Sequence, residues 1–190
     1  MIGVRIAAVI DPQPQRAIET VADHPGIPVF QDLGTALSGD SFDIVDICAP
    51  PQRQGQLTEA SLHAGANVLA DRPITYDLDE CIRLAELADR RERLLMPGFA
   101  YRFYAPILQL RERLDAGDLG RPVMFRARLS GMWEESYFQR TGDILTETGV
   151  SAVDLFRFLC GDIDEASGYA ACVNQDNRVA DTAVLALRGS

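Results

Sequence analysis

The stretch His63-Ala-Gly-Ala-Asn-Val-Leu-Ala-Asp-Arg-Pro73 decides the fold of this 190-residue chain. A helical segment from about Gln54 to Ala64 leads into it and ends at Gly65, a residue type common just past a helix C-terminus. The short apolar run Val68-Leu69 is typical of a buried strand, and the charged residue Arg72 follows it, directly before Pro73. A helix, a glycine turn and a buried strand in this order indicate one unit of an alternating α/β fold.

The same rhythm extends to both sides of that stretch. Apolar runs of the kind found in parallel sheets alternate with segments of helical periodicity. We predict strands at 4–10, 28–30, 42–48, 68–69 and 94–96, and helices at about 12–22, 54–64 and 78–90. The helix at 78–90 carries apolar residues at 78, 82, 84, 85 and 88 as its buried face. Strands that alternate with helices predict an α/β fold with a doubly wound parallel sheet.

The pattern changes after about residue 100. We predict a helix over 105–116 that is stopped by Gly117, a strand over 123–129 with one solvated face, and a helix near 148–159. Two further strands are predicted near 166–173 and 182–187. This part of the chain therefore belongs to a second structural region with a different sheet.

Composition and charge exclude several classes of function. The formal net charge of −10 disfavours nucleic acid and anionic membrane surfaces, both of which attract clustered Lys and Arg. No run approaches the roughly 20 apolar residues of a membrane span, and the apolar start lacks signal-peptide features. We therefore expect a cytoplasmic protein. The four cysteines form no C-x-x-C motif, and Cys48 and Cys160 are expected to be buried free thiols because they lie in apolar runs.

Six short motifs occur in a definite order between residues 4 and 187. They are A-V-I-D at 8–11, D-I-C-A-P-P at 46–51, A-G-A-N-V-L-A-D-R-P at 64–73, G-F-A-Y-R-F at 98–103, D-A-G-D-L-G-R-P-V at 115–123 and E-T-G-V-S-A-V-D at 147–154. Each motif is weak alone, but the ordered set resembles the Gfo/Idh/MocA oxidoreductases, that is, glucose–fructose oxidoreductase, inositol dehydrogenase and their relatives.

The resemblance implies a specific domain organisation. Residues 1–100 are expected to form a partial dinucleotide-binding domain, with an incomplete Rossmann-like doubly wound parallel sheet that lacks its first strand. A linker helix at 101–121 precedes a partial C-terminal α+β substrate domain with an antiparallel sheet at 122–190. The missing strand is central in the usual order, so two strands should have unpaired edges. Truncation at both ends, by a gene fragment or a mis-assigned start, would explain such a chain.

The same resemblance locates the catalytic positions. Oxidation of an alcohol by a nicotinamide needs a group that accepts the hydroxyl proton. The family uses a lysine before a proline, with an aspartate and a histidine four residues apart on one helix face; these positions hold Arg72, Glu147 and Ser151. Arginine keeps its proton and serine has no useful pKa, so Glu147 is the one retained acid–base candidate. Arg72 would hold a substrate carboxylate or polarise a carbonyl, or would form an ion pair with Asp71 or Glu147 in a decayed site.

Cofactor positions follow from the motifs as well. Asp11 would bind the adenosine ribose, which implies NAD rather than NADP, and it could also cap a helix before Pro12. The other expected NAD contacts are Ala49, Pro50, Pro51, Gln54 and Asp71. Gln54 is also expected to be exposed at a helix start. No G-x-G-x-x-G, the turn that binds the pyrophosphate, occurs in the sequence, which leaves NAD binding open.

Aromatic residues and a carboxylate pair are weaker candidates. Tyr101 and Arg102 are expected to line the cleft, with Phe103 more consistent with core packing. The residues Trp133, Tyr137 and Phe138 would line a substrate pocket or cover the sheet. Asp143 and Glu147 have a spacing that suits a metal pair, but the chain's two histidines lie in its N-terminal part, and we expect no metal.

Three functions remain open at this point. One is an NAD(P)-dependent oxidoreductase acting on a sugar, polyol or related small hydroxy compound, catalytically impaired or a fragment. Another is a non-catalytic degenerate homologue or subunit that pairs with an intact relative. The last is an enzyme of another reaction type, with Glu147 as base and Arg72 as an electrostatic clamp. The expected partners are a small-molecule substrate and a second copy or an intact homologue, with no nucleic acid and no membrane.

Overall fold

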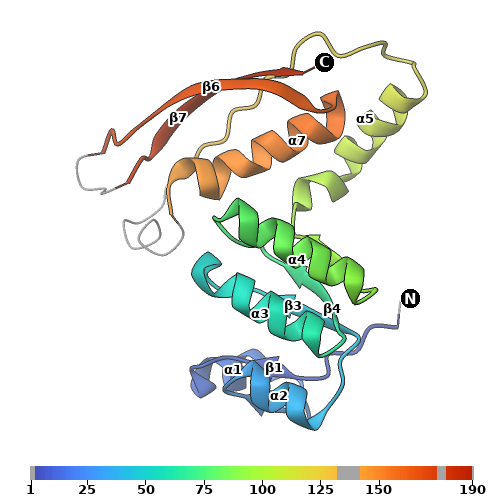
Figure 1. Ribbon diagram of the computed structural model, residues 1–190, viewed down its shortest axis with the longest axis vertical. Coiled ribbons are helices and arrows are strands. Elements are labelled where there is room, and N and C mark those ends of the chain that lie inside the picture. The colour runs from blue at the N-terminus through green and yellow to red at the C-terminus, as the bar shows by residue number, and fades with distance from the viewer. Residues whose placement is uncertain (1–2, 132–141, 175–178, 190) are drawn as a thin grey trace. The chain divides into compact units, whose positions relative to one another are not determined.

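The computed structural model describes residues 3–131, 142–174 and 179–189 (Figure 1). The chain divides into two units, each assembled from separate stretches of sequence. The first comprises Met1–Ala49, Arg53–Ala70 and Asp77–Met96; the second comprises Pro50–Gln52, Asp71–Tyr76 and Pro97–Ser190. The segment that contains Arg72 therefore belongs to the second unit, although it directly follows a strand of the first. The domain limits near 100 and 121 stay a prediction.

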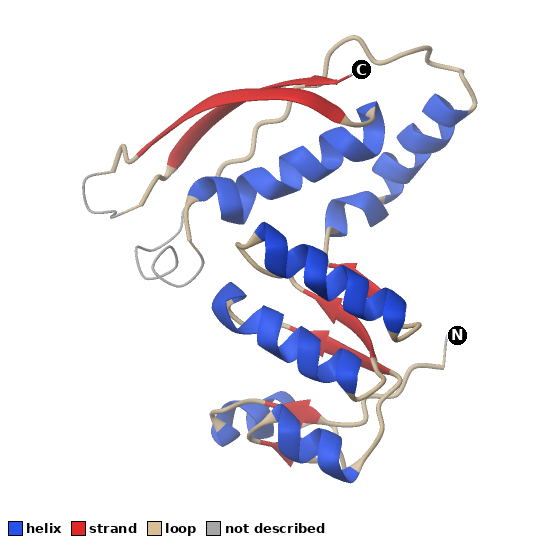
Figure 2. Cartoon of the chain, viewed as in Figure 1, coloured by secondary structure: helices blue, strands red, loops and turns tan. Residues whose placement is uncertain are grey.

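The first unit consists of parallel strands that alternate with helices (Figure 2). Its strands are β1 (Val9–Ile10), β2 (Val29–Phe30), β3 (Ile44–Ile47), β4 (Asn67–Ala70) and β5 (Leu95–Pro97). Its helices are α1 (Pro14–Thr20), α2 (Leu33–Gly39), α3 (Pro51–His63) and α4 (Leu78–Arg90). The predicted α/β class is confirmed, and α2 is a helix that the sequence pattern did not predict.

The strands of the first unit form two separate sheets. β1 pairs in parallel with β2, while the second sheet has the order β3-β4-β5 with β3 and β4 parallel. Within the described residues no strand joins β1 to β3. This confirms that two strands lack a common neighbour. The predicted strand at 4–10 is too long: only Val9 and Ile10 pair, and Val4 and Ile6 are exposed rather than buried.

Local sequence signals account for the helix ends in this unit. The carboxylate of Asp32 accepts a hydrogen bond from the Thr35 N–H at 2.7 Å and so caps α2. Asp77 caps α4 in the same way, through the Glu80 N–H at 2.9 Å. Gly65 adopts a φ of +85°, the left-handed conformation expected after the end of α3.

The core of the first unit is formed by apolar side chains of α3, β4 and α4. Its largest fully buried members are Leu62 and Leu84, joined by Val68. The predicted face of α4 is only half right, because Leu78 and Ile82 are exposed whereas Leu84 and Ala88 are buried. The buried stripe is 84, 87 and 88, which is the i, i+3, i+4 pattern of one helical face.

The second unit contains helical segments and one antiparallel hairpin. Its elements are the 3₁₀ turn η1 (Ala100–Phe103), α5 (Ala105–Asp115), the π-helical turn η2 (Leu145–Gly149), α7 (Val150–Cys160), β6 (Ile163–Ala171) and β7 (Thr182–Gly189). β6 pairs with β7 in antiparallel register, with Tyr169 opposite Val184. The predicted helices and the two final strands are thus present, and the antiparallel sheet is confirmed.

Three predictions fail in this part of the chain and one fails next to β3. The strand predicted at 123–129 does not form among the described residues, and Val123 is 100% exposed. Phe103 is exposed rather than packed in a core. Cys48 is exposed and Cys160 is half-buried, so only their free thiol state was predicted correctly. No helix in the described ranges combines the length and apolarity needed to cross a membrane.

Replacing a core side chain of α4 should unfold the first unit more readily. We expect Leu84→Ala to lower the free energy of unfolding by about 3 kcal/mol, because it leaves a cavity in a packed core. Leu78→Ala, on the same helix but exposed, should change it by less than about 0.5 kcal/mol. Urea denaturation followed by circular dichroism measures both. Equal effects of the two substitutions would contradict the placement of the core.

Candidate functional site

The side chain of Arg72 reaches the segment that carries Glu147, 75 residues away in sequence. Its Nη1 donates a hydrogen bond to the backbone carbonyl oxygen of Glu147 at 3.0 Å and lies 3.5 Å from Glu147 Oε1. The two side chains are 26% and 12% exposed. Asp71, the other possible partner, instead accepts a hydrogen bond from the Arg72 backbone N–H at 2.8 Å. The ion pair with Glu147 is therefore the one that forms.

The ion pair has a direct chemical consequence. A guanidinium does not give up its proton in proteins, so Arg72 is a permanent positive charge and not a base. The carboxylate of Glu147 is held against that charge in a partly dehydrated position, where electrostatic interactions are stronger than in bulk water. The arrangement can orient an anionic or strongly dipolar ligand.

Ser151, the third predicted catalytic residue, does not share an ordinary helical face with Glu147. Glu147 lies in the π-helical turn η2, where the Val150 N–H donates to the carbonyl of Leu145 five residues earlier. That turn holds one residue more than an α-helical turn, which alters the alignment of positions four apart. Ser151 follows in α7 and is 4% exposed. Its catalytic role stays a prediction, and its hydroxyl is enclosed.

A second polar group of this site comes from Tyr76, which the sequence analysis did not single out. Its hydroxyl is hydrogen-bonded to Thr146, and Glu147 and Asp143 are close enough for their charges to act on it. Burial raises the pKa of the Tyr76 phenol, and the negative charges of Glu147 and Asp143 act in the same direction, while the hydrogen bond with Thr146 acts to lower it. The phenol therefore stays protonated at neutral pH. The available signal was its position four residues after Arg72, in the same short segment.

Asp143 organises the start of the helix that holds Thr146 and Glu147. Its Oδ1 accepts hydrogen bonds from the N–H groups of Leu145 and Thr146, at 3.0 and 2.9 Å, and from Thr146 Oγ1 at 3.0 Å. These are the donors that a helix N-terminus leaves unsatisfied. The carboxylate therefore acts here as a cap, and the metal-pair alternative for Asp143 has no support from its contacts.

Gly142 leaves the space in which the Tyr76 and Thr146 hydroxyls meet. Its φ is +98°, a conformation that side chains other than glycine rarely adopt. A Cβ at this position would lie 2.8 Å from the Tyr76 hydroxyl and 2.9 Å from Thr146 Oγ1. Any larger residue would therefore push the two hydroxyls apart.

Arg102 was expected to line the cleft. In the structure its guanidinium instead forms an ion pair with Asp154 that links η1 to α7. Its Nε donates to both carboxylate oxygens of Asp154, at 3.0 and 2.8 Å, and its Nη2 also donates to Oδ1. These hydrogen bonds raise the pKa of Arg102, and the guanidinium also lies 5.1 Å from the centre of the Phe158 ring. Asp154 is buried, so the pair anchors the helix that carries the site.

The predicted cofactor residues lie mainly in the first unit. Asp11 directly follows β1, and its Oδ1 accepts a hydrogen bond from the Gln13 N–H at 2.7 Å, close to the start of α1. An acidic acceptor just past the carboxyl end of a parallel strand fits the ribose hydroxyls of a dinucleotide. Gln54 is 1% exposed, so its expected exposure is wrong: it lies on the inner face of α3.

The remaining predicted positions are placed as follows. Pro51 is the buried first residue of α3, where proline favours helix initiation, and Pro50 before it is exposed. Ala49 is half-buried, and Asp71 is exposed and belongs to the second unit. Tyr101 stacks edge to face on Tyr104, with ring centres 5.3 Å apart. Trp133, Tyr137 and Phe138 lie outside the described residues.

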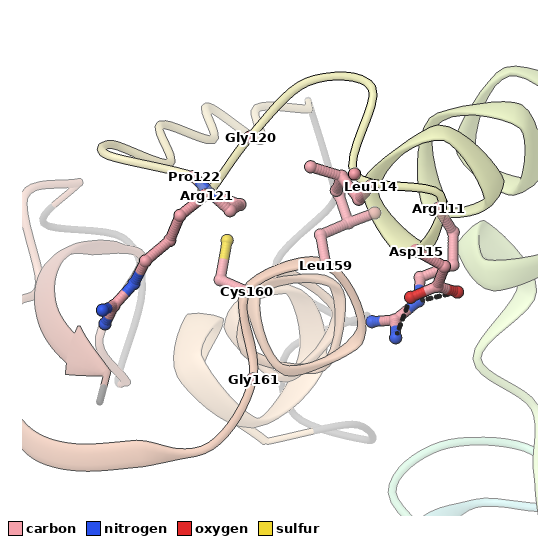
Figure 3. Close-up of a pocket in the computed structure, with 10 residues that line it drawn as sticks. Arg111, Leu114, Asp115, Gly120, Arg121, Pro122, Leu159, Cys160 and Gly161 are labelled. Carbon is pink, nitrogen blue, oxygen red and sulfur yellow. Dashed lines mark hydrogen bonds and ion pairs between the residues drawn. The ribbon is translucent and has the colours of Figure 1, made fainter.

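A separate hollow in the second unit does not coincide with this chemistry. It has a volume of about 430 Å³ and lies beside the C-terminal ends of α5 and α7, where Arg111 is ion-paired with Asp115 at 2.6 Å (Figure 3). Cys160 and Arg121 also line it. None of the predicted catalytic or cofactor residues does. The Arg72–Glu147 pair with Tyr76 is therefore the better candidate site.

Two family models match the chain along most of its length. The model described as "Oxidoreductase family, NAD-binding Rossmann fold" matches residues 3–99. The model described as "GFO/IDH/MocA C-terminal domain" matches residues 107–190. These matches fall on the two regions that the sequence motifs separated.

Individual proteins give the same result. Inositol 2-dehydrogenase of Streptomyces avermitilis is 32% identical over 161 residues, covering 84% of this chain and 46% of that protein. The scyllo-inositol 2-dehydrogenase (NAD(+)) of Bacillus subtilis is 26% identical, covering 90% of this chain and 51% of that protein. An oxidoreductase from Agrobacterium radiobacter, solved in complex with NAD+, L-tartaric acid and magnesium, is 25% identical with a TM-score of 0.85, covering 98% of this chain and 56% of that one. The chain thus spans about half the length of the curated relatives it matches.

Removing the guanidinium of Arg102 should destabilise the second unit. We expect Arg102→Ala to lower the free energy of unfolding by about 3 kcal/mol, because it leaves the buried Asp154 carboxylate without its partner. Arg90→Ala, which breaks the solvent-exposed pair with Glu86, should cost less than about 0.5 kcal/mol. Chemical denaturation of both variants is the measurement. A cost for Arg102→Ala no larger than for Arg90→Ala would rule out the anchoring role.

Proposed function

The chain belongs to the Gfo/Idh/MocA oxidoreductase family, and from this premise we propose that it is an NAD-dependent oxidoreductase with impaired proton transfer. Its substrate class is a polyol, a sugar or a related small hydroxy compound. The observation that carries the proposal is the Arg72–Glu147 ion pair, because it joins the two motifs in which the family places its catalytic groups. The inositol dehydrogenases among the relatives support the substrate class.

The proposed cofactor contacts are those whose geometry suits a dinucleotide. Asp11 would accept hydrogen bonds from the adenosine ribose. The turn formed by Ala49, Pro50 and Pro51 would face the nicotinamide. Asp71, which immediately precedes Arg72, would also contact the cofactor. Gln54 is left out because its side chain is enclosed. When bound, NAD supplies the acceptor for a hydride from the substrate carbon.

The residues of the chain would divide the remaining work. Arg72 would bind the substrate oxygen or a substrate carboxylate through its fixed charge. Glu147 would accept the hydroxyl proton through its carboxylate, whose Oε1 lies 3.5 Å from Nη1 of Arg72. Since arginine offers no basic form and Ser151 is enclosed, we expect turnover to be slow. The proposed binding partners are the small-molecule substrate and either a second copy of this chain or an intact homologue.

A second candidate is a non-catalytic homologue or subunit that pairs with an intact relative. The replacement of both the family's lysine and its histidine, by Arg72 and Ser151, favours this alternative. It predicts that the protein retains the fold and an association surface without oxidising a substrate. If the chain is an impaired oxidoreductase, a basic group at position 72 should restore the reaction. If it is a non-catalytic homologue, the same change should have no effect on activity.

Restoring the basic group tests the proposal directly. We expect Arg72→Lys to raise kcat/KM for myo-inositol oxidation with NAD by about 100-fold, the lower range of general acid–base contributions. Arg72→Gln, which removes the charge and adds no base, is the matched control and should not gain activity. NADH formation followed at 340 nm gives the rates for both variants and the unchanged chain.

Cofactor binding separates the two candidates when rates are low. Titration of NADH fluorescence with the 190-residue chain should saturate if the cofactor site is intact. Saturable binding together with a gain in Arg72→Lys supports the oxidoreductase. Absence of binding, or equal activity of Arg72→Lys and Arg72→Gln, overturns it in favour of the non-catalytic homologue.

A further inference from the structure

We propose that the substrate of this site is a polyhydroxy carboxylate, that is, a sugar acid, and that Arg72 binds its carboxylate through the Nε–Nη2 edge of the guanidinium. The inference rests on the proposed oxidoreductase function and narrows its substrate class. Neutral polyols and hydroxy acids both fall within the class proposed above. The hydrogen-bond donors of Arg72 decide between them.

Arg72 has donors that the described part of the chain does not use. A guanidinium carries five N–H groups that point in fixed directions. Among the described residues its side chain contacts only Glu147, through Nη1, which lies 3.0 Å from the carbonyl oxygen and 3.5 Å from Oε1. Nε and Nη2 have no hydrogen-bond partner in the same residues. The side chain is 26% exposed and neither atom is fully enclosed, so a ligand can reach both.

The same edge of another arginine shows what it binds in this chain. Arg102 holds the carboxylate of Asp154 with its Nε, at 3.0 and 2.8 Å from the two oxygens, and with its Nη2. An arginine edge matches a carboxylate because two parallel N–H groups meet two oxygens. The Nε–Nη2 edge of Arg72 has the same two donors, and no carboxylate of the described residues lies on it. A ligand carboxylate would complete the same arrangement.

A carboxylate fits these donors better than a neutral hydroxyl does. Hydrogen bonds between charged groups are stronger than bonds to neutral acceptors, most of all where water is partly excluded. A hydroxyl offers one oxygen to two N–H groups, whereas a carboxylate offers one oxygen to each. A lysine at position 72 would be a point charge without this paired geometry. Arginine therefore favours acids through its shape as well as its charge.

Glu147 does not compete for this edge. It lies against Nη1, the one guanidinium nitrogen that is outside the Nε–Nη2 edge. One guanidinium can thus hold Glu147 on one side and a ligand carboxylate on another. The hydroxyl that reaches Glu147 as base would then lie farther along the ligand, away from its acid end. A polyhydroxy chain or ring supplies both groups in one molecule, which is why the inferred class is a sugar acid.

A titration without cofactor tests the binding of the carboxylate in the unchanged chain. The 1H–15N resonance of Arg72 Nε is followed by NMR and is assigned by its loss in Arg72→Lys. The ligands are three pairs that differ in a carboxylate against a hydroxymethyl group: D-gluconate and D-glucitol, D-galactonate and galactitol, and D-glucuronate and D-glucose. We expect at least one acid to shift the resonance in a saturable way and its neutral partner not to. No shift with any acid, or equal shifts within every pair, overturns the inference.

Variants separate the paired geometry from charge alone. By calorimetric titration we expect Arg72→Gln to weaken binding of the acid at least about 10-fold. Arg72→Lys should weaken it less, because lysine keeps the charge but loses the two parallel bonds. Arg90→Gln, which removes an exposed arginine of α4, is the matched control and should bind like the unchanged chain. Circular dichroism checks that each variant is folded, and equal affinities of Arg72→Gln and Arg90→Gln overturn the role of Arg72.

Rates with NAD test whether the bound acid is the substrate. We expect kcat/KM for the acid to exceed that for its neutral partner by at least about 10-fold in the unchanged chain, because only the acid gains the bonds to Arg72. Arg72→Lys should lower this ratio, since it supplies a base for neutral polyols and removes the paired donors. An unchanged ratio in Arg72→Lys contradicts selection by the arginine edge. NADH formation at 340 nm gives all rates.

The outcomes separate this inference from the proposed function. If neutral polyols are oxidised as well as the acids, or if an acid binds at Arg72 and only inhibits, the inferred substrate class is overturned and the oxidoreductase stands. If neither the unchanged chain nor Arg72→Lys oxidises any of these compounds or myo-inositol, the proposed function fails and the substrate class fails with it. A shift of the Arg72 resonance, weaker binding in Arg72→Gln and preferred oxidation of the acid together support the inference.

Discussion

The parallel pairing of β3 with β4 is the constraint that fixes the two strands preceding the segments at 50–52 and 71–76. Its register places Ile44 opposite Asn67 and Ile47 opposite Ala70, so both strands end at the same edge of the sheet. The segments that leave this edge are Pro50–Gln52 and Asp71–Tyr76, and both belong to the second unit. The segment at 71–76 carries both Arg72 and Tyr76, and within the second unit Arg72 contacts Glu147.

The charge at position 72 then shapes the rest of the site. A lysine there could exchange a proton, whereas the guanidinium of Arg72 remains charged and holds Glu147 through both its carbonyl oxygen and its carboxylate. Asp143 caps the π-helical turn that carries Glu147, and its carboxylate also accepts a hydrogen bond from the Thr146 hydroxyl. The residue at position 72 thus contacts a polar cluster on another segment of the second unit.

Local patterns predicted most elements but missed features that depend on neighbours. The helix at 78–90 was predicted with its observed bounds because its cap at Asp77 and its periodicity are local signals. The strand predicted at 123–129 failed because strand formation needs a partner that its own residues do not specify. Gln54 was expected to be exposed because it stands at a helix start, yet it is buried on the inner face of α3. Tyr76 was overlooked because nothing in its own segment indicates a bond to Thr146.

The sequence by itself determined the family and most of the helices and strands, and it named the residues at the expected catalytic positions, because motifs and periodicity are properties of adjacent residues. Only the tertiary structure decided that Arg72 pairs with Glu147 rather than Asp71. It also decided that the Tyr76 hydroxyl is hydrogen-bonded to Thr146 and lies within range of the Asp143 charge. These choices bring together segments 75 residues apart in the chain. Such contacts follow from how strands and helices pack, and no local pattern of residues encodes them.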